Sequence, residues 1–389
     1  MPDPSDTARE RGSSPPPVHG LCEPRFSGVR EAFEANFRER GEVGAAVCVI
    51  VDGRVVVDLV GGFADAARTR EWRPDTLVDL YSVGKSLVAL LALRSVARGA
   101  IALDDPVAAA WPEFAAGGKS TATLRHALCH RAGVPAIRER LADLDLFDWD
   151  RMTAALAATE AWWEPGTRHA YHTNTYGHLV GEIVRRTTGA MPGDVLREVA
   201  SGCDADLWCG LPDEEAERCA EVIWDPPAGR DRIDPWPLSG DARMIALGYF
   251  NPPGYSSVGL ANDPRWRRAQ VPSTNTHGTA TGIARLYAAL LEPGRLLPAS
   301  LLAEATRTQS EGFCPVLGEE VAFGLGFVPT TARRPLGPNP RSFGHYGTGG
   351  ALGFADPDAG VAFGYAMNHV IPRWQSTRNR SLVEALYRC

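Results

Sequence analysis

The sequence predicts an α+β fold, in which an antiparallel sheet is flanked by helices and a helical domain is inserted between its strands. Residues 44–62 (GAAVCVIVDGRVVVDLVGG) are rich in β-branched side chains and are divided by Asp52-Gly53, which is a strong hairpin signal. Residues 350–370 repeat this pattern around a turn at 356–360. Because strands near both ends can pair in one sheet, we expect the ends of the chain to come together.

The two ends are expected to form one discontinuous α/β domain, built from residues 21–80 and 270–389. Residues 81–269 form the inserted, mostly helical domain, and residues 1–20 are a polar, Pro-rich lead that we expect to be disordered. A Pro- and Trp-rich segment at about 222–272 lacks periodicity, and is either a pocket-forming excursion or a long surface loop. Helical periodicity predicts helices at 85–98, 123–128, 150–159, 174–188, 278–291, 299–307 and 376–388.

Composition and charge limit the classes of function. The 389-residue chain is 44% hydrophobic and 22% charged, as expected of a globular protein. A net charge of −7 argues against nucleic acid as a partner, and no apolar run reaches the roughly 18 residues that a membrane span needs. The start of the chain lacks the apolar core of a secretion signal, so we expect a cytoplasmic protein whose eight cysteines are free thiols.

Ser82 and Lys85 form an S-x-x-K motif directly before the apolar run 87–96. The chain has only two lysines, Lys85 and Lys119, whereas the other 38 of its 40 basic residues are arginines. Lys can lose its proton when it is buried, and Arg effectively cannot. A Lys one helical turn after a Ser is therefore a candidate base for a serine nucleophile.

A helix that begins at Ser82 would place both side chains on one face. The unpaired N–H groups at the start of such a helix would stabilise an oxyanion. The helix dipole and burial among the flanking apolar residues both disfavour the charged form of Lys85. A phosphate-binding loop is rejected, because Asp79 occupies the position of its first glycine.

Tyr171 and a glycine-rich segment around His345 are candidates for the rest of the site. Tyr171 precedes a predicted helix and would relay protons beside Lys85, with Tyr176 as a competitor. Four glycines within 344–350 would let a strand approach a ligand closely, His345 would donate to a substrate carboxylate or carbonyl, and a nearby N–H would complete an oxyanion hole. The alternatives are a tyrosine packed at a helix start and a tight turn that leads into a strand.

His126, Cys129 and His130 have the spacing of half a metal site. No second cluster offers the remaining ligands at zinc-like spacing, and the H-E-x-x-H motif is absent. We therefore expect hydrogen-bonded histidines at a helix end, and neither a metal nor a cofactor. The G-x-S-x-G motif of α/β-hydrolases is absent as well.

The order of S-x-x-K, a tyrosine and a His-x-Gly strand resembles the serine β-lactamase and penicillin-binding-protein superfamily, and within it the class C-related branch that contains family VIII carboxylesterases. The resemblance implies a β-lactamase/transpeptidase-like fold. It also implies that Ser82 is the acylated nucleophile, with Lys85 and Tyr171 as the proton-transfer pair. It covers residues 25–389, including LCHRAGVP (128–135), WWEPGTRHAYHTNTYGHLVGEIVRRTTG (162–189), NTHGTATGIARLYAALL (275–291) and GGALGFADPDAGVAFGYAMN (349–368).

Two departures from the family pattern concern side chains that bind the substrate. Thr173 stands where the Y-x-N motif of the family has its Asn, unless Asn174 takes that place by a register shift. His345 and Tyr346 stand in place of the Lys and the small hydroxyl residue of K-T-G. The second change weakens the usual recognition of a β-lactam carboxylate.

A third departure is a spacing. Only Thr348 separates the His345 motif from the next two glycines, whereas relatives often have two residues there, so we expect the substrate and oxyanion contacts among His345, Gly347, Thr348 and Gly349. The departures favour a hydrolase of small-molecule carboxylic esters over a true β-lactamase, and the presence of Ser82, Lys85 and Tyr171 together argues against a catalytically silent binding module. The alternative is an acyltransferase or amidase that passes the acyl group to an alcohol or amine.

Tryptophans fall in or near the helical domain and its Pro-rich segment. If they line the cleft, the site is apolar and large enough for a bulky acyl or acceptor group. A dry cleft slows attack by water and favours a bound acceptor. The residues concerned are Trp208, Trp224, Trp236 and Trp266.

Overall fold

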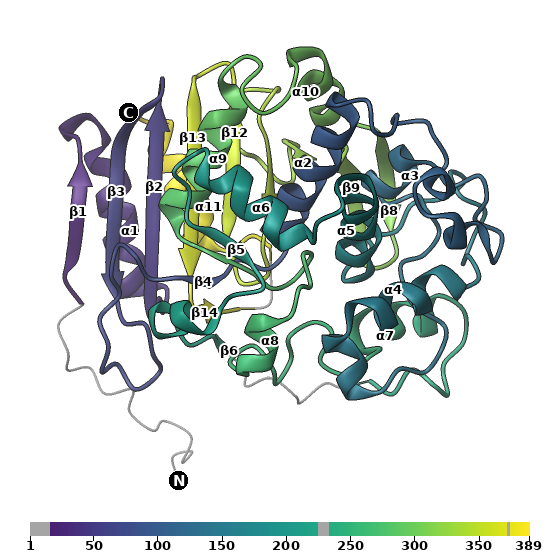
Figure 1. The fold of residues 1–389 in the computed structure, drawn as a ribbon. Helices are drawn as coiled ribbons and strands as arrows, with labels where there is room; N and C mark the ends of the chain where they lie inside the picture. Colours follow the sequence, from purple (N-terminus) through teal and green to yellow (C-terminus); the bar gives the residue numbers. More distant parts are fainter. Residues whose placement is uncertain (1–15, 225–232, 372–373) are drawn as a thin grey trace, which may run out of the picture.

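The computed structural model of the protein describes residues 16–224, 233–371 and 374–389 (Figure 1). Most of the expected disordered lead, residues 1–15, lies outside this range. The first strand begins at Val18 and pairs with the strand that closes the first hairpin, so the last residues of the expected lead belong to the sheet.

A seven-stranded antiparallel sheet forms one side of the molecule, with the strand order β1-β3-β2-β13-β12-β11-β10. Its strands are β1 (Val18–Cys22), β2 (Gly44–Val51), β3 (Arg54–Gly62), β10 (Val328–Pro329), β11 (Phe343–Tyr346), β12 (Leu352–Asp356) and β13 (Val361–Met367). Val51 of β2 lies opposite Val361 of β13. The expected antiparallel sheet built from both ends of the chain is therefore confirmed, and Figure 1 shows its early and late strands side by side.

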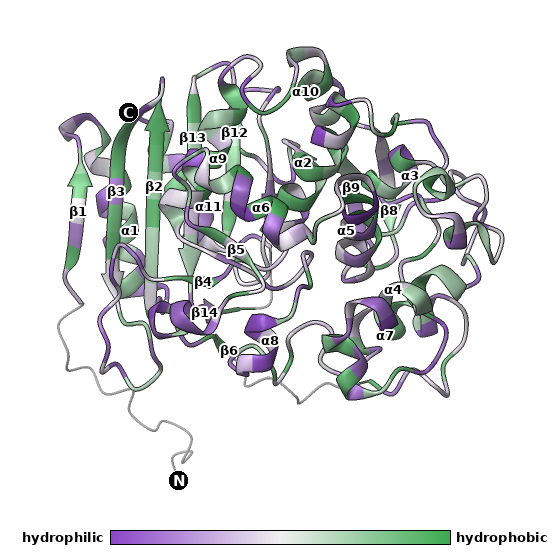
Figure 2. Ribbon diagram, viewed as in Figure 1, coloured by the Kyte–Doolittle hydropathy of each residue, from purple (hydrophilic) through white to green (hydrophobic). Residues whose placement is uncertain are grey.

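The first hairpin turns where the sequence predicts. Asp52 and Gly53 have φ angles of 49° and 77°, the left-handed values that a two-residue type I′ turn requires. Figure 2 shows that β2 and β13 are apolar along their length, and both strands are buried almost throughout. This pairing at the middle of the sheet forms the core of the fold.

The predicted helices all occur, with ends shifted by no more than two residues. The sequence analysis missed α1 and α6, and it missed the two helices, α7 and α8, that interrupt the Pro- and Trp-rich segment. The helices are α1 (Ser27–Glu39), α2 (Val83–Ala97), α3 (Leu124–Leu128), α4 (Trp149–Ala158), α5 (Thr175–Thr188), α6 (Pro192–Ser201), α7 (Gly240–Phe250), α8 (Pro264–Arg268), α9 (Ala280–Leu291), α10 (Ala299–Thr306) and α11 (Thr377–Leu386).

Helix α2 runs through the interior, packed against α5, α6 and β11. Short strands flank its start: β4 (Val78–Asp79), β7 (Thr276–Gly278) and β5 (Leu207–Cys209) form one small sheet, and β8 (Ser310–Cys314) pairs with β9 (Glu319–Phe323). Helix α9 lies against the middle strands of the large sheet, and α1 packs against α11. Over the described residues, no helix is both long and apolar enough to cross a membrane.

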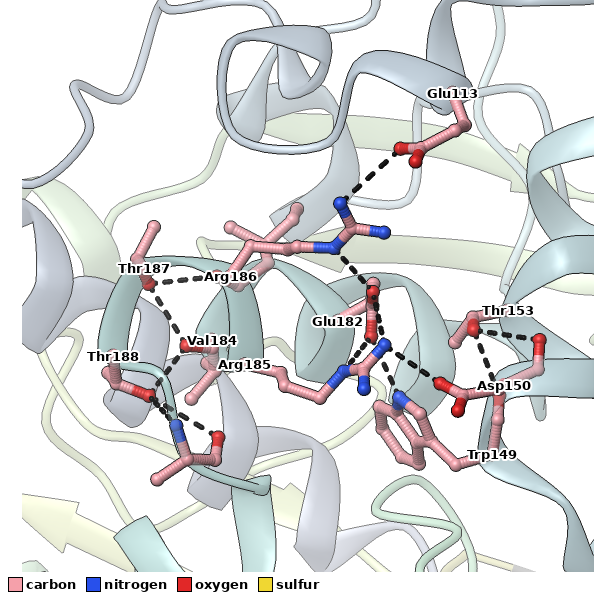
Figure 3. A network of polar contacts seen from close by, with 12 residues as sticks. Glu113, Trp149, Asp150, Thr153, Glu182, Val184, Arg185, Arg186, Thr187 and Thr188 are labelled. Atoms are coloured by element: carbon pink, nitrogen blue, oxygen red, sulfur yellow. Dashed lines mark hydrogen bonds and ion pairs between the residues drawn. The ribbon is translucent and has the colours of Figure 1, made fainter.

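A buried carboxylate, Glu182, fixes the second half of α5 (Figure 3). Its oxygens accept hydrogen bonds from Arg185 at 2.7 and 3.0 Å, from Arg186 at 2.7 Å and from Trp149 Nε1 at 2.7 Å. Burial raises the pKa of Glu182, but these hydrogen bonds outweigh burial and lower it below its ordinary value. The network anchors the helix whose first turn follows Tyr171.

Candidate active site

Ser82 lies where the short strand β4 gives way to α2. The residue before it, Tyr81, has a φ of 50°, a left-handed conformation that costs free energy for a non-glycine residue. Asp79 holds this turn, because its Oδ1 accepts the N–H of Tyr81 at 2.9 Å. Ser82 is the N-cap residue of α2, but its hydroxyl makes no capping hydrogen bond. The Ser82 hydroxyl therefore remains available for chemistry.

Lys85 meets the requirements for a neutral base. Its Nζ lies 3.0 Å from Ser82 Oγ and 3.0 Å from the carbonyl oxygen of Ser273, and the side chain is fully buried. No carboxylate within the described ranges forms an ion pair with it. Burial therefore holds the pKa of Lys85 well below its ordinary value. The close approach of α2 to the Ser273 segment depends on Gly84, where a Cβ would lie 2.2 Å from the oxygen of Pro272.

Tyr171 joins this pair, whereas its competitor does not. The centre of its ring lies 4.8 Å from Lys85 Nζ, and its hydroxyl is buried without a hydrogen-bond partner among the described residues. Burial raises the pKa of Tyr171 well above its ordinary value, although the nearby Ser82 side chain acts in the opposite direction. Tyr176 instead donates its hydroxyl proton to the carbonyl oxygen of Leu128, at 3.3 Å.

His345 lies beside Tyr171, with ring centres 6.5 Å apart, but its geometry does not match the expected role as a donor. Its Nδ1 is 2.8 Å from the carbonyl oxygen of Tyr346, so the ring proton sits on Nδ1 and is already used. Burial lowers the pKa of His345 to about 3, so the ring is neutral at pH 7. Only the lone pair of Nε2 remains, and it accepts hydrogen bonds rather than donating them.

The backbone hydrogen bonds show which N–H groups near Ser82 are free to bind an oxyanion. The N–H of Gly347 already donates to Ala351 at 2.7 Å, whereas the N–H groups of Ser82 and Thr348 have no acceptor in the part of the chain that the structure describes. Ser82 and Thr348 line the same cavity, and Gly349 is not among its lining residues. Gly347 has another role: a Cβ there would lie 2.3 Å from the oxygen of Leu80, so glycine lets this segment approach the turn before Ser82.

A cavity of about 400 Å³ opens at Ser82. Of the four tryptophans expected to line it, only Trp224 does so; Trp266 packs against Asp79, and Trp374, which the sequence analysis did not single out, is present instead. The Pro- and Trp-rich segment contributes several lining residues, so of its two alternatives the pocket-forming excursion is observed. The lining residues are Tyr81, Ser82, Thr173, Asn174, Trp224, Tyr249, Phe250, Ser256, Val258, Thr274, Leu317, Glu319, Arg334, Thr348 and Trp374.

Asn174 does not behave as a free substrate ligand. Its Nδ2 donates to Gly248 at 2.8 Å and to Ser256 at 2.7 Å, and its Oδ1 accepts from Thr274 at 2.7 Å. All of these contacts hold the cavity wall together. Thr173 also lines the cavity, and its Oγ1 is buried without a hydrogen-bond partner among the described residues.

The histidines with metal-like spacing are engaged by the backbone. His126 Nδ1 accepts the N–H of Thr123 at the start of α3, and His130 Nδ1 accepts the N–H of His172. His172 in turn directs Nδ1 at the carbonyl oxygen of Ala170, and its Nε2 accepts the N–H of Val134. These bonds shape the loop that presents Tyr171, and burial keeps the pKa of His172 near 4, so this ring is neutral at pH 7.

A serine within hydrogen-bond distance of a buried lysine at the start of a buried helix, beside a large antiparallel sheet, is the arrangement expected of a serine hydrolase of the β-lactamase type. The family profile described as Beta-lactamase matches residues 29–386 of the chain. The chain therefore belongs to the beta-lactamase family.

Relatives in sequence and structure agree with this assignment. The chain is 32% identical to the Esterase/beta-lactamase LipL of Mycobacterium tuberculosis, over 91% of this chain and 83% of the relative. A crystal structure of a family VIII carboxylesterase superposes with a TM-score of 0.88 at 40% identity, covering 96% of this chain and 100% of that one. A penicillin-binding protein homolog from Caulobacter crescentus gives a TM-score of 0.86 at 37% identity, covering 96% and 99%. The β-lactamase/transpeptidase-like fold expected from the sequence is thus confirmed.

Proposed function

We propose that this protein is a carboxylesterase that cleaves small-molecule esters through an acyl-enzyme on Ser82. The observation that carries the proposal is the fully buried Lys85, whose Nζ lies 3.0 Å from Ser82 Oγ. Because burial favours its neutral form, Lys85 has a lone pair at the position where the Ser82 proton must be accepted. The esterases among the relatives support the choice of ester as substrate class.

Acylation begins when Ser82 Oγ bonds to the ester carbonyl carbon and its proton passes to Lys85 Nζ. The N–H groups of Ser82 and Thr348 bind the oxyanion that forms on the carbonyl oxygen. The bond to the leaving oxygen then breaks, and Tyr171 gives its phenolic proton to the alcohol. Its raised pKa suits it to this role, because the phenol is protonated before the step. The proton on Lys85 returns to Tyr171, and water repeats the sequence to release the acid.

The His345 strand favours esters over β-lactams. His345 is neutral and its ring proton is bound to the backbone, so this strand offers no cation and no free side-chain donor for a β-lactam carboxylate. The hydroxyl of Tyr346 is also engaged, since it accepts from Gln375 at 3.0 Å and donates to Pro335 at 3.3 Å. Because the usual recognition of a β-lactam carboxylate in the family comes from this strand, we propose weak turnover of β-lactams.

Acyl transfer is the second candidate, and the aromatic lining of the cavity favours it. Trp224, Tyr249, Phe250 and Trp374 border the cavity at Ser82, and such a surface binds an organic acceptor better than it orders water. The test is product partitioning with 4-nitrophenyl butyrate and rising concentrations of 1-butanol or benzylamine. Transfer product that grows with the acceptor supports this candidate, and butyric acid as the sole product at every concentration excludes it.

Intact-protein mass spectrometry during turnover of 4-nitrophenyl butyrate tests the primary proposal. We expect one added butyryl group on the wild-type protein and none on Ser82→Ala, with the same circular dichroism spectrum for both. Hydrolysis that persists in Ser82→Ala would show that another residue is the nucleophile. Nitrocefin serves as the comparison substrate, and its hydrolysis at a higher kcat/KM than the ester would make the protein a β-lactamase.

A further inference from the structure

The cavity at Ser82 contains an ion pair, Arg334–Glu319, that the proposed mechanism does not use. Both residues line the cavity together with Ser82 and Thr348. Among the lining residues that the structure describes, they are the only two with charged side chains. Arg334 comes from the segment between β10 and β11, and Glu319 is the first residue of β9. A charged pair in a cavity whose other lining residues are aromatic, aliphatic or neutral polar is a candidate for substrate selection.

The Arg334 guanidinium is held in a fixed orientation. Its Nη2 donates to the Glu319 carboxylate, and its central carbon lies 4.2 Å from the centre of a Trp374 ring. Only 12% of the side chain is exposed. A guanidinium held at its edge by a carboxylate and on its face by an aromatic ring keeps little rotamer freedom, so binding a further group costs little entropy.

One donor of this guanidinium has no partner. Arg334 Nη1 is buried and makes no hydrogen bond to any described residue. Leaving a buried donor unpaired costs about 1–3 kcal/mol, and more for a charged group. Because the Arg334 side chain lines the cavity at Ser82, a substrate oxygen bound against the guanidinium would supply the partner that Nη1 lacks.

The local charge favours an anionic oxygen. The second oxygen of Glu319 accepts from Arg333 Nε at 2.6 Å, so two guanidinium groups share one carboxylate. Lys85 and His345 add no charge of either sign, because burial keeps both neutral. Because the Glu319 carboxylate is shared with Arg333, it neutralises Arg334 only in part, and the planar guanidinium of Arg334 matches the geometry of a carboxylate.

We propose that Arg334 binds a free carboxylate of the substrate through Nη1, so that the preferred substrates are carboxylic esters bearing a second, unesterified carboxylate. This inference rests on the proposed ester hydrolysis at Ser82. It assigns selection of the substrate to a side chain outside the Ser82, Lys85 and Tyr171 group.

The test compares two esters with the same acyl chain length, 4-nitrophenyl hydrogen glutarate and 4-nitrophenyl pentanoate. We expect the wild type to prefer the glutarate, and Arg334→Gln to lower the glutarate-to-pentanoate ratio of kcat/KM about tenfold or more, the loss of one charge-assisted hydrogen bond. Arg334→Lys keeps the charge but not the planar guanidinium, so its glutarate-to-pentanoate ratio should lie between those of the wild type and Arg334→Gln. A third ester, 4-carboxyphenyl pentanoate, carries its free carboxylate on the alcohol side. If Arg334→Gln loses the preference of the wild type for either anionic ester over 4-nitrophenyl pentanoate, the proposal is supported.

Arg333→Gln is the matched control. Arg333 contacts the same Glu319, but its side chain is 65% exposed and does not line the cavity. We expect Arg333→Gln to change the ratio less than about threefold, since an exposed charge is screened by solvent. An unchanged ratio in Arg334→Gln for both anionic esters, or an equal fall in Arg333→Gln, would overturn the proposal.

A binding measurement separates this inference from the proposed function. Isothermal titration of glutarate into Ser82→Ala should give a dissociation constant that rises about tenfold or more in Ser82→Ala/Arg334→Gln. This measurement does not depend on turnover. If the wild type fails to hydrolyse pentanoate, the proposed function fails while glutarate binding still tests Arg334. If pentanoate is hydrolysed but glutarate binding is absent or independent of Arg334, the inference alone is wrong.

Discussion

Lys85 shows why the two basic residue types are not interchangeable in this chain. The environment of its Nζ offers a carbonyl oxygen and the Ser82 hydroxyl, and the described ion pairs include no carboxylate partner for it. A buried ammonium without a counter-ion is costly, so this environment selects a neutral amine. A guanidinium cannot lose its proton under these conditions.

We therefore predict that Lys85→Arg lowers kcat for 4-nitrophenyl butyrate by about 10²–10⁴-fold, the scale of a lost general base. In the wild type, kcat/KM should fall as pH drops through the lowered pKa of Lys85 and its amine becomes protonated. The measurement is a pH–rate profile of both proteins. Lys85→Met controls for packing, because it is equally inactive as a base and adds no buried charge. Near-wild-type turnover in Lys85→Arg would rule out a neutral lysine base.

Tyr171 and Tyr176, the two candidate tyrosines of the sequence analysis, provide a second test at the scale of single residues. Tyr171 has a free hydroxyl near Lys85, and the Tyr176 hydroxyl is bound to Leu128. We expect Tyr171→Phe to lose about 10²–10⁴-fold in kcat, and Tyr176→Phe to lose mainly stability. Steady-state kinetics and thermal melts of both variants distinguish these effects. A larger kinetic loss in Tyr176→Phe would reverse the assignment.

Single residues were predictable from sequence where the chemistry is local. Ser82 and Lys85 are one helical turn apart, so their contact follows from the helix alone. The contacts of Arg334 with Glu319 and Trp374 join three separate segments, and no spacing in the chain encodes them. His345 was identified as a neighbour of the site, but its neutral state depends on burial that a sequence does not display.

At the scale of elements, the turn from β4 into α2 contains both the left-handed residue Tyr81 and a buried carboxyl group, that of Asp79. Asp79 is fully buried, and burial raises its pKa to about 8 from an ordinary 3.8. Between these two pH values the folded protein holds a proton that the unfolded chain has released. Its stability therefore falls as pH rises from about 4 to 8.

We predict that Asp79→Asn removes this pH dependence while keeping an oxygen for the N–H of Tyr81. The gain in unfolding free energy over the wild type should be small at pH 5 and reach about 1–3 kcal/mol at pH 8.5, since each unit of pKa shift is worth about 1.4 kcal/mol and relaxation reduces the total. Urea unfolding at both pH values measures it. A gain that is equal at both pH values would show that the carboxyl does not titrate in this range.

A clear apolar period did not by itself decide which helices were predicted, since α1 and α6 are amphipathic and were missed, whereas α2 is apolar all round and was found. Helices α2 and α5 were predicted to within two residues, α2 from the S-x-x-K motif and the apolar run after it, and α5 from its apolar spacing. Helix α7 lies in a segment whose apolar residues follow no single face, so only its tertiary contacts reveal it. The same segment supplies Trp224 to the cavity, whereas Trp236 packs against a separate apolar cluster, and the sequence does not distinguish the two.

At the scale of the whole molecule, the pairing of distant strands was predictable from the sequence. The buried contacts of Arg378 that accompany this pairing were not. Each of the two apolar hairpins near the ends of the chain needs a neighbouring strand, and β2 of the first hairpin pairs with β13 of the second. Behind this pairing, Arg378 at the start of α11 is buried against residues 40–42. Its Nε donates to the oxygen of Arg40 at 2.9 Å, and its Nη1 lies 3.2 Å from Glu42 Oε1.

We predict that Arg378→Met destabilises the protein by about 3–5 kcal/mol, because it leaves the Glu42 carboxyl buried without its cation. Burial already raises the pKa of Glu42, so the loss should shrink as pH falls and the carboxyl takes up a proton. Adding Glu42→Gln to Arg378→Met should recover part of the stability, which a double-mutant cycle by urea unfolding measures. Activity per folded molecule is the control, since Arg378 is remote from Ser82 in the chain and does not line the cavity. Strictly additive losses would mean that the two ends are held by the sheet alone.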